Sequence, residues 1–95
     1  MFEFEWDEAK NRSNIIKHGI PFEEAKTVFA DPHGRLMHDP DHAHQEDRYV
    51  LLGMSHSLRM LVVCHCDRKN DSVIRIISAR KATRRERQLY KGELS

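Results

Sequence analysis

The chain opens with a strict alternation of apolar and acidic residues. Phe2, Phe4 and Trp6 are separated by Glu3 and Glu5. A period of two is typical of a strand with one apolar face. The pattern therefore predicts a short strand at the N-terminus.

The next two segments have the spacing and the end signals of helices. Asp7 stands at an N-cap position before a short, very polar helix over residues 8–17, which Gly19 ends. Pro21 can begin a second helix that the Asp-Pro pair at 31–32 ends. The second helix has apolar positions at helical spacing, which should be buried: Phe22, Ala25, Val28 and Phe29.

From residue 35 the pattern changes to that of strands. Residues 35–38 form a weak edge candidate, and residues 47–54, 58–66 and 72–79 form stronger strands. Short, turn-rich links join the stronger strands and predict an antiparallel meander. Thr83 and the glutamate three residues later match a capping box, which opens a basic helix to about Lys91. This order predicts an α+β fold.

Length and composition favour one small folded domain over residues 1–95. The chain has 95 residues, of which 39% are hydrophobic and 33% charged, with 3 Pro and 4 Gly, so it is neither disordered nor of low complexity. The apolar run 60–64 is too short to span a bilayer, and the acidic N-terminus is unlike a signal peptide. We therefore expect a cytoplasmic protein with no membrane contact.

Charge is distributed unevenly along the chain. Residues 1–47 carry 5 basic and 11 acidic residues, whereas residues 68–95 carry 9 basic and 3 acidic residues. Either the basic end meets a polyanion or the two ends neutralise each other in the fold. Arginines inside the predicted strands and a basic junction over residues 80–87 together favour contact with a nucleic-acid backbone.

Histidines and cysteines raise the question of metal or redox chemistry. His38, His42 and His44 crowd one segment, but no local framework would hold a metal, which favours a solvated, mobile loop. Cys64 and Cys66 share one face of a predicted strand, and this spacing favours reduced, buried thiols over a disulfide or a metal site.

The ordered combination of motifs resembles the BrnT toxin family over nearly the whole chain. The matching residues are Phe4-Glu5-Trp6-Asp7, Lys10, Asn14, Lys17-His18-Gly19, Phe22-Glu23-Glu24-Ala25, Val28-Phe29, Asp31-Pro32, Glu46, Arg48, Gly53, 75–80, Ala82-Thr83, Glu86 and Tyr90. The resemblance implies a RelE-like fold and a toxin of a type II toxin–antitoxin system that cuts RNA and arrests translation. It also implies a ribbon-helix-helix antitoxin, BrnA. The pair would repress its own operon, so operator DNA would be contacted only through the complex.

A ribonuclease of this size with no evident metal cage, and no cofactor, would use the ribose 2′-hydroxyl as the nucleophile. That reaction needs a base, an acid and cations around the phosphorane. Glu46 is the predicted base and His18 the predicted acid, although the helix dipole is by itself a sufficient explanation for a histidine beside Lys17 at a helix end. The predicted phosphate ligands are Arg48, Arg75 and Arg80. Further RNA contacts are expected from Lys17, Arg59, His65, Lys81, Arg84 and Arg85, with His65 also a reserve for either proton-transfer role.

Two other functional classes remain open at this point. A non-catalytic nucleic-acid-binding or adaptor subunit could dock through its basic C-terminal end, and it would bind in a salt-sensitive way without producing new RNA termini. A metal-binding regulator could use the 7 histidines and the 2 cysteines.

Overall fold

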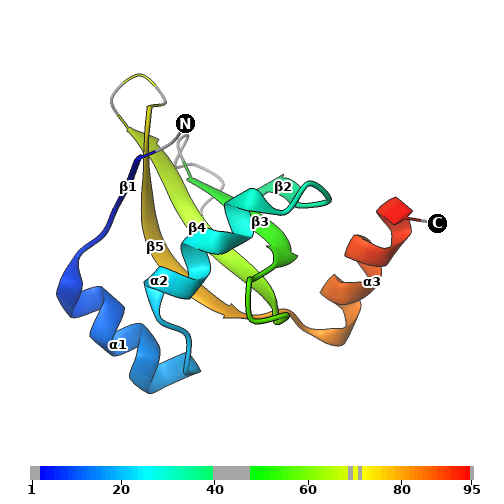
Figure 1. The fold of residues 1–95 in the computed structure, drawn as a ribbon, viewed down its shortest axis with the longest axis horizontal. Coiled ribbons are helices and arrows are strands. Elements are labelled where there is room, and N and C mark those ends of the chain that lie inside the picture. The colour runs from blue at the N-terminus through cyan, green and yellow to red at the C-terminus, as the bar shows by residue number, and fades with distance from the viewer. Residues whose placement is uncertain (1–2, 40–47, 69, 71, 95) are drawn as a thin grey trace.

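The computed structural model describes residues 3–39, 48–68, 70 and 72–94. Figure 1 shows one sheet with helices around it, and the strand order is β1-β5-β4-β3-β2. The predicted α+β class and order of elements are confirmed. The elements are β1 (Glu3–Glu5), α1 (Glu8–His18), α2 (Phe22–Ala25), the 3₁₀ helix η1 (Lys26–Ala30), β2 (Arg35–His38), β3 (Arg48–Met54), β4 (Met60–Arg68), β5 (Val73–Lys81) and α3 (Arg84–Leu94).

The sheet is mixed. Strands β2, β3, β4 and β5 are antiparallel to their neighbours in sequence, whereas β1 runs parallel to β5 with Phe4 opposite Ile74. A parallel pair needs a long crossover, and the segment from α1 to β4 supplies it. Strand β4 begins at Met60, later than predicted, because Leu58 lies in the preceding turn with a φ of 62°.

Local signals fix both ends of α1. The Asp7 carboxylate accepts hydrogen bonds from the backbone N–H groups of Ala9 (2.8 Å) and Lys10 (3.2 Å). Gly19 ends the helix in the left-handed region, with φ of 72°, and its N–H donates to the Ile15 carbonyl. The predicted N-cap and the predicted C-terminal glycine are both confirmed.

The second predicted helix is not continuous. It consists of α2 followed by η1, and the change occurs where Lys26 follows Ala25. The Thr27 hydroxyl donates to the carbonyl of Glu24 at 2.7 Å, a local hydrogen bond that competes with regular helix geometry. The expected burial is found for Phe22, Ala25 and Val28, which are fully buried, whereas Phe29 is partly buried.

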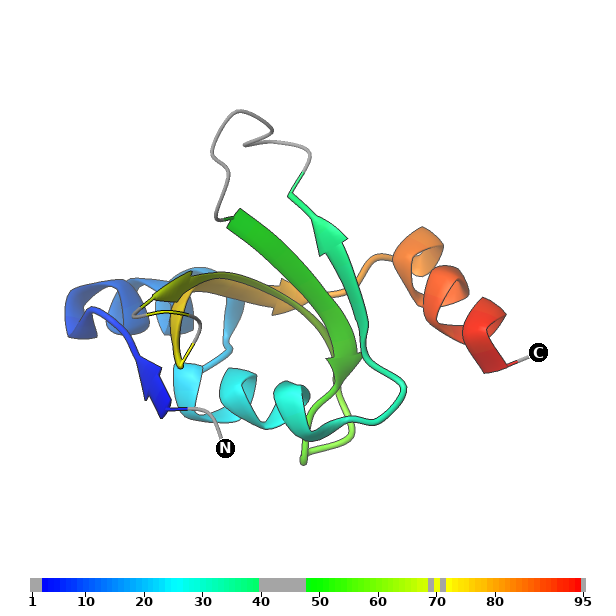
Figure 2. The same ribbon diagram turned by 90° about the horizontal axis from the view of Figure 1, so that it is seen from above.

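The sheet has two faces that differ in how they are covered. The inner face packs against α2 and η1 and holds the main core, which includes Leu51, Leu61, Val63 and Ile76. The outer face carries a smaller cluster in which Tyr90 of α3 packs with strand residues of β3 and β4. Figure 2 shows α3 projecting to the side, so that it covers the outer face in part.

Helix α1 completes the sheet edge that β1 leaves open. Strand β1 pairs with β5 only over Val73 to Arg75. Further along β5, the Asn14 side chain donates to the Ala79 carbonyl (2.8 Å) and accepts from the Ala79 N–H (3.1 Å). An asparagine amide thus replaces a strand partner, which keeps this buried stretch of backbone hydrogen-bonded.

Both cysteines are free thiols, as predicted. Cys64 is buried, whereas Cys66 is only partly buried. Within the described ranges, no helix has both the length and the apolar character needed to cross a membrane.

Candidate active site

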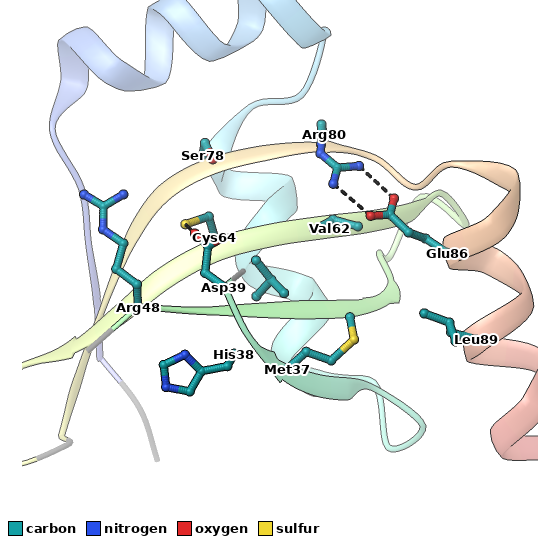
Figure 3. A pocket seen from close by; sticks show the side chains of 11 residues that line it. Met37, His38, Asp39, Arg48, Val62, Cys64, Ser78, Arg80, Glu86 and Leu89 are labelled. Atoms are coloured by element: carbon teal, nitrogen blue, oxygen red, sulfur yellow. Dashed lines mark hydrogen bonds and ion pairs between the residues drawn. The ribbon is translucent and has the colours of Figure 1, made fainter. Parts of the chain in front are cut away.

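A pocket opens on the outer face between the sheet and α3 (Figure 3). Its volume is about 360 Å³. The residues that line it come from strands β2 to β5, the residue that follows β2, and α3: Met37, His38, Asp39, Arg48, Val50, Val62, Cys64, Ser78, Arg80, Glu86 and Leu89. Charged groups therefore surround an apolar floor.

Of the predicted phosphate ligands, the pocket unites Arg48 and Arg80. They come from β3 and β5, on either side of β4. Cys66 of β4 pairs with Arg48 on one side and with Arg75 on the other, so Arg75 follows Arg48 in the same row across the outer face. Arg75 does not line the pocket, because its guanidinium donates to the Glu5 carboxylate at 2.9 Å.

Arg80 is oriented by a two-pronged ion pair. Its two terminal nitrogens donate to the two carboxylate oxygens of Glu86, each at 2.8 Å. Glu86 also closes the predicted capping box. Its carboxylate accepts from the Thr83 N–H at 2.8 Å, and the Thr83 hydroxyl accepts from the Glu86 N–H at 3.2 Å. The hydrogen bonds from Arg80 are the main reason that the pKa of Glu86 falls to about 2. Glu86 is therefore a fixed anion and a poor proton acceptor.

Asp39 and Cys64 form the buried side of the pocket. The Cys64 thiol donates to the Asp39 carboxylate at 3.5 Å, and Asp39 is 5% exposed. Its backbone N–H bonds to the Arg48 carbonyl at 3.4 Å, which places Asp39 beside Arg48. Burial, then the hydrogen bond to Asp39, raises the pKa of Cys64 to about 11. Cys64 is thus a protonated thiol rather than a nucleophile.

His38 reaches the pocket from the end of β2, but its ring is turned elsewhere. The ring centroid lies 5.3 Å from that of Tyr49, its register partner on β3. In Figure 3 the imidazole points away from the Arg80–Glu86 pair. His38 is therefore placed at the rim and not opposite the arginines.

The predicted RNA ligand Arg59 is engaged in a structural ion pair. Its guanidinium donates to both carboxylate oxygens of Glu24, with the Nε contact at 2.9 Å, and to the Gly19 carbonyl at 3.3 Å. Glu24 is 6% exposed, and the hydrogen bond from Arg59 is the main cause of its lowered pKa. Arg59 therefore joins α2 to the β3–β4 turn, away from the pocket.

The predicted proton-transfer residues do not gather with the arginines. His18 ends α1 beside Gly19 and does not line the pocket, and Lys17 is exposed next to it. His65 is 3% exposed on the inner face, where its ring packs against Phe29 and burial lowers its pKa. This burial gives no support to the prediction that His65 contacts RNA. Glu46 lies outside the described residues.

The remaining predicted RNA ligands stand at the junction of β5 and α3. Lys81, Arg84 and Arg85 are all exposed there, directly after Arg80 and around Glu86. Two arginines in the first turn of a helix oppose the helix dipole, which is positive at that end. An anion at this junction would relieve that cost, in agreement with the basic surface that the sequence predicts.

The sequence raised the question whether histidines and cysteines bind a metal ion. Over the described residues, no group of three or more His, Cys, Asp or Glu side chains is arranged to hold a metal ion. His42 and His44, which belong to the histidine-rich segment, lie outside those residues.

Sequence reasoning missed two carboxylates of the pocket. Asp39 was hidden in a segment that reads as an exposed loop, and no local pattern shows that it is buried beside Cys64. Glu86 was recognised only as a helix cap. The basic residues before it, Arg80 above all, were the available signal that this carboxylate also has a partner across the junction.

Comparisons with known proteins identify the family. The family model described as the ribonuclease toxin BrnT of type II toxin–antitoxin systems matches residues 6–86. The crystal structure of the Brucella abortus ribonuclease toxin BrnT has a similar fold, with a TM-score of 0.69 and 22% sequence identity over 88% of this chain and 100% of that chain. No curated protein sequence matches the chain significantly. Because the family model covers most of the chain, including the pocket's two arginines, this protein belongs to the BrnT family of ribonuclease toxins of type II toxin–antitoxin systems.

Proposed function

We propose that this protein is an endoribonuclease that cuts RNA without a metal ion and thereby inhibits translation in the cytoplasm. The observation that carries the proposal is the placement of Arg48 and Arg80 around one pocket on the outer face. Two guanidinium groups from separate strands are suited to hold a phosphodiester from two sides, because each presents forked N–H donors.

The proposed reaction is an internal transfer at phosphorus. The 2′-oxygen attacks the adjacent phosphorus, the bond to the 5′-oxygen breaks, and the products are a 2′,3′-cyclic phosphate and a 5′-hydroxyl. Arg48 and Arg80 would stabilise the negative charge that accumulates on the phosphorane. The 2′-proton goes to a base and the 5′-oxygen receives a proton from an acid.

The base is proposed to be a carboxylate near Arg48. Glu46 precedes Arg48 by two residues and remains the base predicted from the sequence. Asp39 is the structural alternative, since it lines the pocket beside Arg48. Glu86 is a weaker choice, because Arg80 keeps its pKa at about 2. Mutating each carboxylate to its amide separates the candidates.

The acid predicted from the sequence, His18, has no support from the geometry. It ends α1 beside the Arg59–Glu24 pair and outside the pocket lining. Its role is kept as a hypothesis that His18→Ala tests directly. Lys81, Arg84 and Arg85 are proposed to bind the RNA backbone beyond the scissile phosphate, through charge rather than base recognition.

The test is cleavage of a defined RNA by purified protein in the presence of a chelator. Wild type should produce 2′,3′-cyclic phosphate termini, and Arg48→Ala and Arg80→Ala should each lose about 10²-fold or more in rate, as other preorganised charge-stabilising groups do. Arg12→Ala, which removes an exposed arginine from α1, is the matched control and should leave the rate unchanged. Full activity of both pocket variants at equal folded concentration would overturn the proposed site.

The same assay separates catalysis from simple docking. A non-catalytic nucleic-acid-binding or adaptor subunit would bind RNA in a salt-dependent way and leave its termini unchanged. Loss of cleavage upon chelation, restored by a divalent ion, would contradict the metal-free mechanism.

We further propose that the antitoxin partner is a BrnA-like ribbon-helix-helix protein and that the complex represses its own operon. The support is membership of a type II toxin–antitoxin family, whose toxins require an antitoxin. A RelE-like architecture is proposed on the same basis. Operator DNA binding should require the antitoxin, so the toxin alone should not shift operator DNA in an electrophoretic assay.

A further inference from the structure

The carboxylate of Asp31 joins three separate parts of the fold. It lies just after η1, and it accepts hydrogen bonds from the His33 N–H (2.9 Å), the Met54 N–H at the end of β3 (2.8 Å) and the Tyr90 hydroxyl of α3 (2.8 Å). Gly53 makes this approach possible, because a Cβ at that position would lie 3.2 Å from the Asp31 carboxylate and 2.7 Å from a methyl carbon of Val28.

Tyr90 is the residue through which α3 is seated on the sheet. It is 7% exposed, whereas the other residues over 84–89 are exposed or only partly buried. Its ring packs with Leu52 and Val62 on the outer face. Because Tyr90 is the buried side chain among those described over 84–90, the position of α3 depends strongly on it.

Glu86 lies one helical turn before Tyr90, at the i, i+4 spacing that places two side chains on the same side of a helix. This is the carboxylate that grips Arg80 with two hydrogen bonds of 2.8 Å. A chain of contacts therefore runs from Asp31 through Tyr90 and the body of α3 to Glu86 and Arg80. It connects the end of η1 to the pocket on the outer face.

We propose that Tyr90 and Asp31 are positioning residues that hold α3 so that Glu86 fixes the orientation of the Arg80 guanidinium for the phosphodiester. The inference rests on the proposed function, in which Arg80 binds the scissile phosphate. Neither Tyr90 nor Asp31 touches the RNA in this scheme. Their effect reaches the phosphate only through the position of α3.

The charge states of Asp31 and Tyr90 favour a stable hydrogen bond between them. Burial works against the ionised form of Asp31, but hydrogen bonds from Met54, His33 and Tyr90 outweigh it and lower its pKa. Burial and the hydrogen bond to Asp31 raise the pKa of Tyr90. Around neutral pH the pair is therefore a hydroxyl donating to a carboxylate, which is a charge-assisted hydrogen bond.

The first experiment removes the hydroxyl and keeps the ring. Tyr90→Phe should lower kcat for RNA cleavage by about three- to tenfold, the loss that corresponds to one hydrogen bond, with a smaller change in KM. Tyr49→Phe makes the same chemical change on β3 and should leave kcat unchanged. Rates are normalised to folded protein measured by circular dichroism, so that a purely structural loss does not count as a loss of kcat.

The second experiment asks whether Tyr90 acts through Glu86. In a Glu86→Gln background, Tyr90→Phe should lower kcat by less than twofold, because the ion pair that it positions is already weakened. Equal effects of Tyr90→Phe in both backgrounds, or an unchanged kcat in the single variant, would overturn the inference. Full cleavage by Arg80→Ala is a different result, since it would overturn the proposed function itself.

Discussion

Asn14 offers the sharpest test of how this fold is held together. The residue is 6% exposed, and its amide makes three hydrogen bonds: to the Ile20 carbonyl (2.8 Å), to the Ala79 carbonyl (2.8 Å) and from the Ala79 N–H (3.1 Å). It therefore ties α1 both to the following segment and to β5. The informative perturbation is Asn14→Ala, which removes the amide and keeps a good helix former.

The expected loss follows from the groups that the variant leaves behind. Ile20 and Ala79 are both fully buried, so their freed backbone groups cannot easily turn to water. An unsatisfied buried polar group costs roughly 1–3 kcal/mol, and three such groups with partial relaxation give about 3 kcal/mol. For a domain of this size, that lowers Tm by roughly 12–24 °C. The loss is a large fraction of the roughly 5–15 kcal/mol of a typical domain.

The assay is urea denaturation followed by circular dichroism, with a thermal melt as a second measurement. Ser13→Ala is the matched control, because Ser13 is the exposed neighbour on the same helix and its replacement should change stability by less than about 0.5 kcal/mol. A loss below about 1 kcal/mol for Asn14→Ala, with an unchanged m-value, would refute the reasoning that Asn14 takes the place of a strand partner.

Two further predictions follow from the pKa values. The pKa of Glu86 is about 2 in the folded protein against 4.5 for the free side chain, so its stabilising effect is complete above about pH 4.5 and is lost as the pH falls toward 2. The unfolding free energy of wild type should therefore fall more steeply over this range than that of Glu86→Gln, and parallel curves would contradict the ion pair. Alkylation of the native protein at pH 8 should modify Cys66 before Cys64, because Cys64 is buried and its pKa is about 11; mass spectrometry of Cys64→Ser and Cys66→Ser measures both rates, and equal rates would contradict the burial.

The element ends could be predicted because their causes are local. Asp7 and Gly19 bound α1 through contacts within a few residues, and Thr83 and Glu86 form the capping box that the sequence pattern shows. One exception is the second helix, where a regular apolar spacing concealed the change to a 3₁₀ turn. There a single hydroxyl, that of Thr27, competes with the backbone for a carbonyl.

The candidate site was predicted less completely because partners came from distant parts of the chain. Arg48 and Arg80 were predicted as phosphate ligands, and both line the pocket. Arg59 was predicted as an RNA ligand from its place at the start of a predicted strand, but it pairs with Glu24, 35 residues earlier. His65 was predicted as an RNA contact and as a reserve for proton transfer, although the fold turns it to the inner face against Phe29. Such pairings depend on register and packing, which no local pattern contains.

The register between β4 and β5 explains why arginines from both halves of β5 share one face. Arg75 and Arg80 are five positions apart, so strict alternation would place them on opposite faces. Cys64 pairs with Ser78, but the next residue of β4, His65, pairs with Ile76. The residue between these two partners on β5, Ile77, is therefore the extra residue of a β-bulge.

The bulge reverses which positions of β5 face inward, at the point where the strand passes from the core to the pocket. Before Ile77, the even positions Ile74 and Ile76 face inward and fill the core. After it, the odd position Ala79 faces inward, and Ser78 and Arg80 turn outward to line the pocket. An unbroken strand that kept Ile74 and Ile76 in the core would direct Arg80 into it as well, where a guanidinium without a partner costs several kcal/mol. Because of this one unpaired residue, the first half of β5 contributes side chains to the hydrophobic core, and the second half directs Arg80 to the pocket.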